Sequence, residues 1–247
     1  MVIKEYNSLD EVLTKGIKEL LLEEPSDFGS IHGMNGYIQD LFITTKTLGC
    51  SIDLGSYLYT RNKWSQLLKL YVDKDELVNF ANILKTSKSY SQTFYFKQKS
   101  RTVGHGNGSC LISMVVTRPN RNQKFNRAVI MYRTTVLTKQ FVCDLVLLNK
   151  LATYLNENTD GQCVITKGAL YAPWASMHAF QLALYCKNFK VNPKKYPGNF
   201  LCCKATKWIE EYFSGERVTK FKSFDRLIRY HNEGTLPSIP IESLKIF

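Results

Sequence analysis

Two apolar runs joined by a short basic turn constrain the fold of this chain more than any other feature. Residues 110–117, C-L-I-S-M-V-V-T, form a β-branched run, and residues 125–135, F-N-R-A-V-I-M-Y-R-T-T, form a second one. Pro119 and Asn120 begin the turn between them, among arginines and a lysine. We therefore predict a β-hairpin. Its apolar residues occupy both alternating sets of positions, so we expect both of its faces to be covered.

Helical periodicity is present on both sides of this hairpin. Residues 8–24 begin with a capping-box pattern, Ser8 and Glu11, and residues 139–156 carry a long apolar stripe. Further helices are expected at 37–47, 73–85, 173–185, 208–213 and 223–230. Further strands are expected at 91–99 and 164–171, loops at 25–37, 104–108 and 193–200, and an extended apolar tail at the end. The fold class is α+β: a single domain over residues 1–247, with a mixed β-sheet covered by helices.

Charge and cysteine content limit the classes of function. The chain has 247 residues and a net charge of +12, which favours anionic partners such as nucleotides, with nucleic acid an open alternative. The seven cysteines show no C-x-x-C pair and no zinc spacing, so we expect no metal. Acidic residues near the N-terminus and the lack of a long apolar run predict no membrane association and a cytoplasmic location, the host cytoplasm if the chain is viral.

Three residues are poorly explained by structure alone. Asp144 lies on or beside the apolar stripe of its helix, where a carboxylate must be paired or face a ligand. Arg133 ends a strand and Thr134 and Thr135 follow it, and a planar fork of donors beside two hydroxyls suits a phosphate. Cys110 begins a strand after a glycine-rich loop, where nearby arginine would lower the pKa of its thiol. Each also has a structural reading: a paired acid, a surface arginine or an inert thiol.

Cys110, Arg133-Thr134 and Asp144, in this order, resemble the thymidylate synthase family, and within it most of all the phage dCMP hydroxymethylases. That family places a nucleophilic cysteine at a strand start and an Arg-Ser pair at the end of the returning strand. Eleven residues after the arginine it has Asn in uracil-using members and Asp in cytosine-using ones, and here that position is Asp144. The stretch G-A-L-Y-A-P-W-A-S-M, from residue 168, resembles a later family strand and aligns Tyr171 with a ribose-binding tyrosine.

The resemblance implies a thymidylate synthase-like fold, a homodimer and a transferase. Cys110 would add to C6 of a pyrimidine deoxynucleotide monophosphate, most readily dCMP, and 5,10-methylenetetrahydrofolate would donate a one-carbon unit to C5. The product would carry a hydroxymethyl or a methyl group. Asp144 would bind the base, Arg133 and Thr134 the phosphate, and Tyr171 the sugar.

The sequence departs from the family pattern at several positions. The family's Pro-Cys-His is replaced by Ser109, Cys110 and Leu111, and its histidine before the tyrosine by Ala169. Residues 87–91, S-K-S-Y-S, lack the arginine pair that the family gives to the partner subunit. The general-base glutamate has no clear counterpart, and Asp40 is the nearest acid.

Two other readings therefore stay open. One is a catalytically inactive homologue of the same fold that acts as a nucleic-acid-binding or protein-binding component. The other is an unrelated basic DNA-binding domain, which the lack of a helix-turn-helix, zinc-finger or RRM pattern disfavours.

Overall fold

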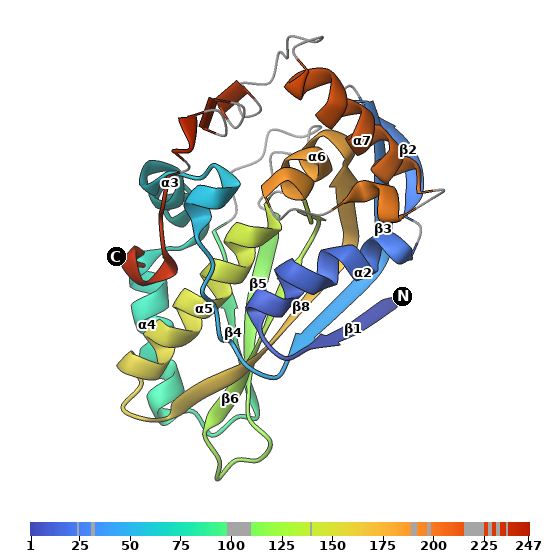
Figure 1. Cartoon of the computed structure of the whole chain (residues 1–247). Coiled ribbons are helices and arrows are strands. Elements are labelled where there is room, and N and C mark those ends of the chain that lie inside the picture. Colours follow the sequence, from blue (N-terminus) through green and yellow to red (C-terminus); the bar gives the residue numbers. More distant parts are fainter. Residues whose placement is uncertain are drawn as a thin grey trace, which may run out of the picture.

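The computed structural model describes residues 1–23, 25–30, 33–97, 110–138, 140–188, 192–196, 199–214, 225–226, 229–230, 233–235 and 237–247. Within these ranges the chain forms a mixed sheet with strand order β1-β3-β8-β6-β5-β4, with β2 pairing to β3 and β7 to β8 (Figure 1). The strands are β1 (Val2–Tyr6), β2 (Ser26–Ser30), β3 (Gly33–Thr45), β4 (Ser91–Tyr95), β5 (Leu111–Thr117), β6 (Phe125–Tyr132), β7 (Thr135–Val136) and β8 (Cys163–His178). The pairs β1–β3, β6–β8 and β7–β8 are parallel.

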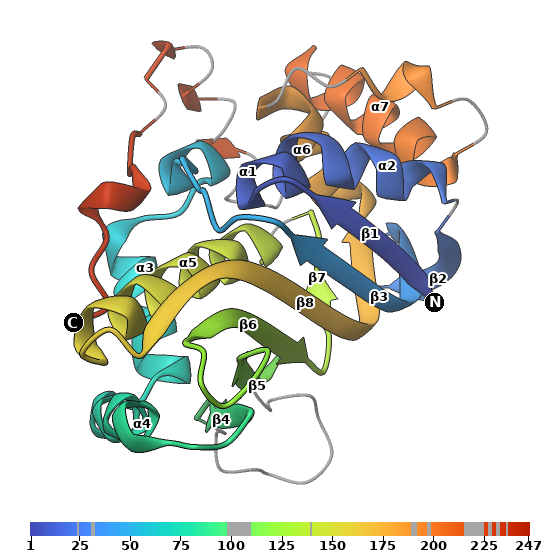
Figure 2. The ribbon, with the colours of Figure 1, turned by 90° about the horizontal axis from the view of Figure 1, so that it is seen from below.

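The helices gather on one side of this sheet (Figures 1 and 2). They are α1 (Leu9–Glu11), a π-helical turn η1 (Val12–Gly16), α2 (Ile17–Leu22), α3 (Arg61–Tyr71), α4 (Lys74–Thr86), α5 (Phe141–Asn158), α6 (Ala179–Asn188) and α7 (Phe200–Phe213). Short 3₁₀ turns are η2 (Leu54–Tyr57), η3 (Pro193–Lys195) and η4 (Ile241–Ser243). Among the described helices, none has the length and apolar content that a bilayer crossing requires.

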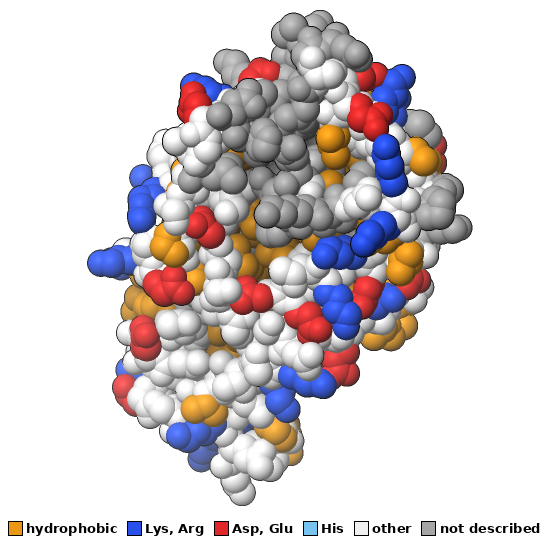
Figure 3. Space-filling model, viewed as in Figure 1, with side chains coloured by type: hydrophobic (Ala, Val, Ile, Leu, Met, Phe, Trp, Pro, Cys, Tyr) orange, Lys and Arg blue, Asp and Glu red, His pale blue; other side chains and the backbone are white. Residues whose placement is uncertain are grey.

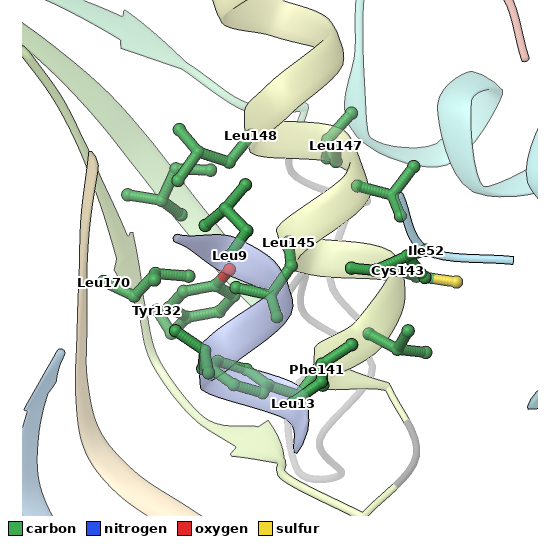
Figure 4. Packing of buried hydrophobic residues seen from close by; sticks show 14 of the residues in the cluster. Leu9, Leu13, Ile52, Tyr132, Phe141, Cys143, Leu145, Leu147, Leu148 and Leu170 are labelled. Carbon is green, nitrogen blue, oxygen red and sulfur yellow. The ribbon is translucent and has the colours of Figure 1, made fainter. Parts of the chain in front are cut away.

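Helix α5 lies at the centre of the core and is apolar on most of its circumference. Leu145 and Leu148 point toward the sheet, while Cys143 and Leu147 point to the opposite side (Figure 4). Gly168 of β8 allows α5 to pack closely against the sheet, because a Cβ at this position would lie only 2.5 Å from Leu48 and 3.1 Å from Leu148. The helix is therefore buried between the sheet and the segments packed above it, which fixes the position of its first turn.

The strand register divides the side chains between a covered and an open face. One row of paired residues crosses the covered face from β4 to β1. Its members are buried in every strand but the last: Phe94, Met114, Ile130, Leu170 and Ile43, followed by the half-buried Lys4 of β1. The neighbouring row on the other face contains Ile3, Phe42, Tyr171, Met131, Ser113 and Tyr95. Ile3 is 59%, Met131 36% and Tyr95 67% exposed. Within this chain, the prediction that both faces of the hairpin are covered is therefore wrong.

The prediction of a helix at 37–47 is also wrong, because this segment belongs to β3. Its inward residues Ile38 and Leu41 are three apart, which imitates helical spacing. The cause is Asp40, whose backbone has a left-handed φ of 50°. At this residue the strand shifts by one position in the alternation of side chains between the two faces of the sheet. Asp40 lies between the paired residues Gln39 and Leu41, opposite Pro173, which has no N–H for the ladder.

The predicted helix at 173–185 is correct only in its second half. Pro173 was assigned to the first turn of a helix, but it lies within β8, and α6 begins only at Ala179. The predicted loop at 25–37 contains β2 and the start of β3, which form a hairpin instead. Gly36 allows this hairpin to approach α7, since a Cβ there would lie 2.8 Å from Leu201.

Other elements agree with the sequence patterns. The predicted helices at 8–24, 73–85, 139–156 and 208–213 overlap α1 to α2, α4, α5 and the end of α7, with α4 and α5 ending one and two residues later than predicted. The predicted strands at 91–99, 110–117, 125–135 and 164–171 contain β4, β5, β6 with the start of β7, and the first part of β8. The predicted tail has a 3₁₀ turn at η4. The loop at 104–108 lies outside the described residues, as does half of the segment at 223–230.

Candidate functional site

Cys110 lies directly before β5 and is paired with Arg133 at the end of β6. The backbone N–H of Arg133 donates to the carbonyl oxygen of Cys110 at 2.8 Å. The Arg133 guanidinium also donates a hydrogen bond to the Cys110 thiol. From α3, the hydroxyl of Tyr71 accepts a hydrogen bond from the Cys110 backbone N–H. The half-buried thiol is therefore held between an exposed arginine and a buried tyrosine.

Asp144 is buried in the first turn of α5, with an exposed fraction of 2%. Its Oδ2 accepts a hydrogen bond from the hydroxyl of Thr135 at 3.3 Å. Burial raises the pKa of the Asp144 carboxyl to about 8, and the bond from Thr135 only partly opposes that effect. The carboxyl is therefore mostly protonated at neutral pH and can both donate and accept a hydrogen bond.

Thr135 is fixed by the sheet, because β7 pairs with β8 at this point. Thr135 is the register partner of Ala175, and its carbonyl oxygen accepts a hydrogen bond from the Ser176 hydroxyl at 3.2 Å. Its own hydroxyl then reaches Asp144 across the connection into α5. The sheet thus positions the residue that orients the buried carboxyl.

The electrostatics of Cys110 combine opposing effects. Burial raises the pKa of its thiol, the charge of Asp144 raises it further, and Arg133 lowers it, with a net shift upward. Since Asp144 is mostly neutral below its own pKa of about 8, its repulsion of the thiolate acts mainly above that pH. Around neutrality, burial and Arg133 are therefore the main opposing influences on the thiol.

The other residues singled out in the sequence lie elsewhere. The hydroxyl of Tyr171 donates to Oδ1 of Asp40 at 3.0 Å, and both belong to the open face of the sheet. Within the described part of the chain, neither makes a hydrogen bond to Cys110, Arg133 or Asp144. The structure thus brings together Cys110, Arg133 and Asp144, and it leaves Tyr171 and Asp40 as a separate pair.

One member of this cluster, Tyr71, was not found from the sequence. Tyr71 belongs to α3, which we did not predict, although Trp64, Leu67, Leu68 and Tyr71 recur at helical spacing and could have indicated it. The sequence suggests both Thr134 and Thr135 as hydroxyls for a phosphate beside Arg133, and the resemblance gives that role to Thr134. Thr134 is half-buried and makes no described hydrogen bond, whereas Thr135 contacts Asp144.

A cavity of about 700 Å³ lies close to this cluster. Trp64, Leu68 and Val72 of the α3 segment form its apolar wall, and Lys97 also lines it. The Lys97 backbone N–H donates to the carbonyl oxygen of Tyr71 at 2.8 Å, which connects the cavity to the residue that bonds Cys110. No three His, Cys, Asp or Glu side chains in the described ranges gather as metal ligands would.

Comparison with known proteins gives no further assignment: no family model matches the chain, and no curated protein matches it at a significant level.

Proposed function

We propose that the chain is a divergent thymidylate synthase-like transferase that modifies C5 of a pyrimidine deoxynucleotide monophosphate, with dCMP as the preferred substrate. The observation that carries the proposal is the meeting of Cys110, Arg133 and Asp144 from three separate segments. Arg133 bonds the Cys110 thiol, and Asp144 lies near enough for its ionised form to raise the pKa of that thiol. A nucleophile, a cation for phosphate and a buried hydrogen-bonding group are the parts this chemistry needs.

Cys110 begins the reaction in this proposal. Its thiolate adds to C6 of the ring, and the electron pair moves to C5, which then bonds to the one-carbon unit. When bound, 5,10-methylenetetrahydrofolate supplies that unit. The C5 proton would leave to water, and the bond between the one-carbon unit and the folate nitrogen would break with its electron pair going to that nitrogen, which would leave an exocyclic methylene on C5. This methylene would take up hydroxide in a hydroxymethylase, or hydride from the folate in a methylase. Loss of the Cys110–C6 bond restores the ring.

Asp144 suits the edge of the base because its carboxyl is mostly neutral at pH 7. A neutral carboxyl presents one donor and one acceptor, and cytosine presents the complementary pair at N3 and its amino group. Thr135 donates to Oδ2, which leaves Oδ1 to carry the proton that bonds N3. Uracil also offers one donor and one acceptor, so both nucleotides belong in the test.

We propose the cavity beside Tyr71 as the site of the expected folate. Trp64 and Leu68 provide an apolar wall for a flat ring. Arg61, Lys69 and Lys74 provide positive charge for carboxylates at the same cavity, which Asp73 and Asp75 partly offset, with Asp73 paired to Lys97 at 2.8 Å. We place the pterin nearer the Cys110 side, where Lys97 lines the cavity.

A homodimer follows from the same proposal. The open-face row through Ile3, Phe42, Tyr171 and Met131 is largely apolar and is not covered by the described part of the chain. A second copy is the occupant that we propose for it, because burial of this row would remove exposed apolar surface from water. Met131→Asp should convert the dimer to a monomer in sedimentation velocity, whereas a dimer that persists would contradict this interface.

Tritium release tests the reaction. Wild type with methylenetetrahydrofolate and 5-tritiated dCMP or dUMP should release tritium to water, with dCMP preferred. Cys110→Ala should abolish release, and Cys203→Ala, at an exposed cysteine outside the cluster, should leave it unchanged. A folded wild-type protein that releases tritium from neither nucleotide would contradict the proposal.

A second candidate function rests on the raised pKa of the thiol and on the separation of Asp40 from Cys110. Both favour a catalytically inactive homologue that acts as a nucleic-acid-binding or protein-binding component. Calorimetric titration with dCMP distinguishes the two: the transferase must bind the nucleotide, and the binding component need not.

A further inference from the structure

The open face of the sheet changes from apolar to basic along its strands. Two rows beyond the Tyr171–Met131 pair, Lys167 of β8 lies directly beside Arg127 of β6, and Arg127 lies beside Thr117 of β5. Paired residues on neighbouring strands share a face and are about 5 Å apart. Two cations therefore stand side by side at this end of the sheet, with a hydroxyl next to them.

These residues line a groove of about 470 Å³. Its lining is mostly polar and contains Lys46, Arg118, Arg127 and Lys167, with Thr44, Thr117 and Asn126 as uncharged donors and Glu5 as the acid. Glu5 lies 4.0 Å from Lys46, at the limit of an ion pair. The Arg118 guanidinium is occupied by the carbonyl oxygens of Ser87 and Ser89, so it shapes the groove rather than offering free donors.

Arg127 and Lys167 make no ion pair with any residue that the structure describes. Like charges directly opposite one another in a sheet are destabilising. On the helix-covered side, by contrast, acidic and basic side chains are interspersed (Figure 3). An uncompensated pair of cations in a groove with hydroxyl and amide donors is a site suited to phosphate.

The positive charge extends beyond the groove onto the hairpin between β5 and β6, which projects at the bottom of Figure 1. Arg121 and Lys124 are exposed there, between Pro119 and Asn126 of the groove wall. Arg121 lies over the ring of Tyr90, 5.2 Å from its centroid, and that tyrosine is 53% exposed. The Tyr90 carbonyl oxygen accepts a hydrogen bond from the Arg118 N–H at 3.0 Å, which places the aromatic residue beside the groove.

We propose that this groove and hairpin bind single-stranded nucleic acid, with Arg127 and Lys167 on the phosphates and Tyr90 stacking on a base. The cations extend from Arg127 and Lys167 in the groove to Arg121 and Lys124 on the hairpin, which is more positive charge than one phosphate needs. This arrangement favours a polymer over a free nucleotide. An exposed aromatic ring beside the cations favours a single strand, whose bases are free to stack. The inference is independent of the proposed transferase reaction, because it uses none of the residues around Cys110.

Fluorescence anisotropy with a short labelled DNA strand tests the proposal on the full-length protein. Wild type should bind, and the double variant Arg127→Gln/Lys167→Gln should bind at least about tenfold more weakly. In a plot of the logarithm of the binding constant against the logarithm of the salt concentration, the slope of the variant should be less steep by about 1.4. The control Lys204→Gln/Lys207→Gln removes the same charge from α7 and should bind as wild type does. Tyr90→Ala should weaken single-strand binding about tenfold.

Three results would overturn the proposal: no binding by wild type, equal weakening by the groove and control variants, or equal affinity for the matching duplex. Circular dichroism of each variant excludes loss of fold as the cause of weaker binding. Cys110→Ala should bind the strand as wild type does, and the groove variant should release tritium as wild type does. Failure of this inference is therefore distinguishable from failure of the transferase.

Discussion

At one end of the β5–β6 pair, Cys110 and Arg133 lie beside a buried carboxyl, and at the other end Thr117 and Arg127 lie beside Lys167 in an open groove. Burial dominates the first end, where the pKa values of Asp144 and Cys110 are both raised. At the second end, Arg127 and Lys167 lie side by side and make no ion pair with a described residue. The same two strands therefore carry a site where charge is suppressed and a site where it is concentrated.

This difference indicates which kind of ligand each end suits. A desolvated cluster binds a small group that completes its hydrogen bonds, because each buried polar atom gains a partner. An exposed pair of cations gains from any nearby phosphate and needs little shape complementarity. Four substitutions test this contrast, two of them with a matched change at the opposite end of the sheet.

The largest effect is expected from Asp144→Asn on the pH dependence of stability. The unfolded carboxyl titrates near pH 4 and the folded one near 8, so the folded state holds the proton more tightly between these values. The contribution of Asp144 is therefore fully present below about pH 4 and is lost as pH rises toward 8, by about 1.4 kcal/mol per pH unit. The variant should lack this slope in urea unfolding between pH 5 and 8. Parallel curves would mean that Asp144 is ionised in the fold.

A smaller loss is expected from Thr135→Val, which removes the hydroxyl that donates to Asp144. Its free energy of unfolding should fall by about 1 kcal/mol. Thr117→Val is the matched change at the other end, where the hydroxyl makes no described hydrogen bond, and it should change stability by less than about 0.5 kcal/mol. Equal losses of unfolding free energy in the two variants, measured by urea unfolding, would contradict a stabilising hydrogen bond from Thr135 to Asp144.

Arg133→Gln should slow alkylation of Cys110. The guanidinium lowers the pKa of the thiol, so its loss should reduce the thiolate fraction and the rate with iodoacetamide at pH 8 by about threefold. Peptide mass spectrometry separates Cys110 from the exposed Cys203. Arg127→Gln, at the far end of the same strand, should leave the Cys110 rate unchanged, and a similar decrease there would indicate a general charge effect.

The smallest effect is expected from Arg127→Gln on stability. Removal of one of two adjacent cations should raise the free energy of unfolding by about 0.3 kcal/mol at low ionic strength. The gain should disappear in about 1 M salt, where charges a few ångströms apart are screened. A loss of stability at low salt would mean that Arg127 has a stabilising partner.

The sequence predicted the parts of the fold in which local pattern and tertiary structure agree. Strands β5 and β6 are β-branched and bounded by a turn, and α5 has a long apolar stripe, so both were identified. Strand β3 was mistaken for a helix because the kink at Asp40 shifts its buried residues to a spacing of three. That kink depends on pairing with a distant segment of β8, which local periodicity does not contain.

The candidate site was predicted in part for a similar reason. Cys110, Arg133 and Asp144 lie close together in the sequence, on a hairpin and the helix that follows it, so their meeting depends on few long-range contacts. Tyr71 comes from α3, and it reaches Cys110 only through the packing of distant segments. The basic groove was indicated only by net charge, because its residues come from five strands, β1, β3, β8, β6 and β5, that are neighbours in the sheet but mostly distant in the sequence.

The most direct test of the central claim is a covalent adduct on Cys110. Incubation with 5-fluoro-dCMP and methylenetetrahydrofolate should trap one, because fluorine at C5 cannot leave as a proton does. Intact mass followed by peptide mapping should find the nucleotide and the folate joined to Cys110 in wild type, and no adduct in Cys110→Ser. A protein that binds the nucleotide but forms no adduct at Cys110, or forms one at another cysteine, would contradict the account.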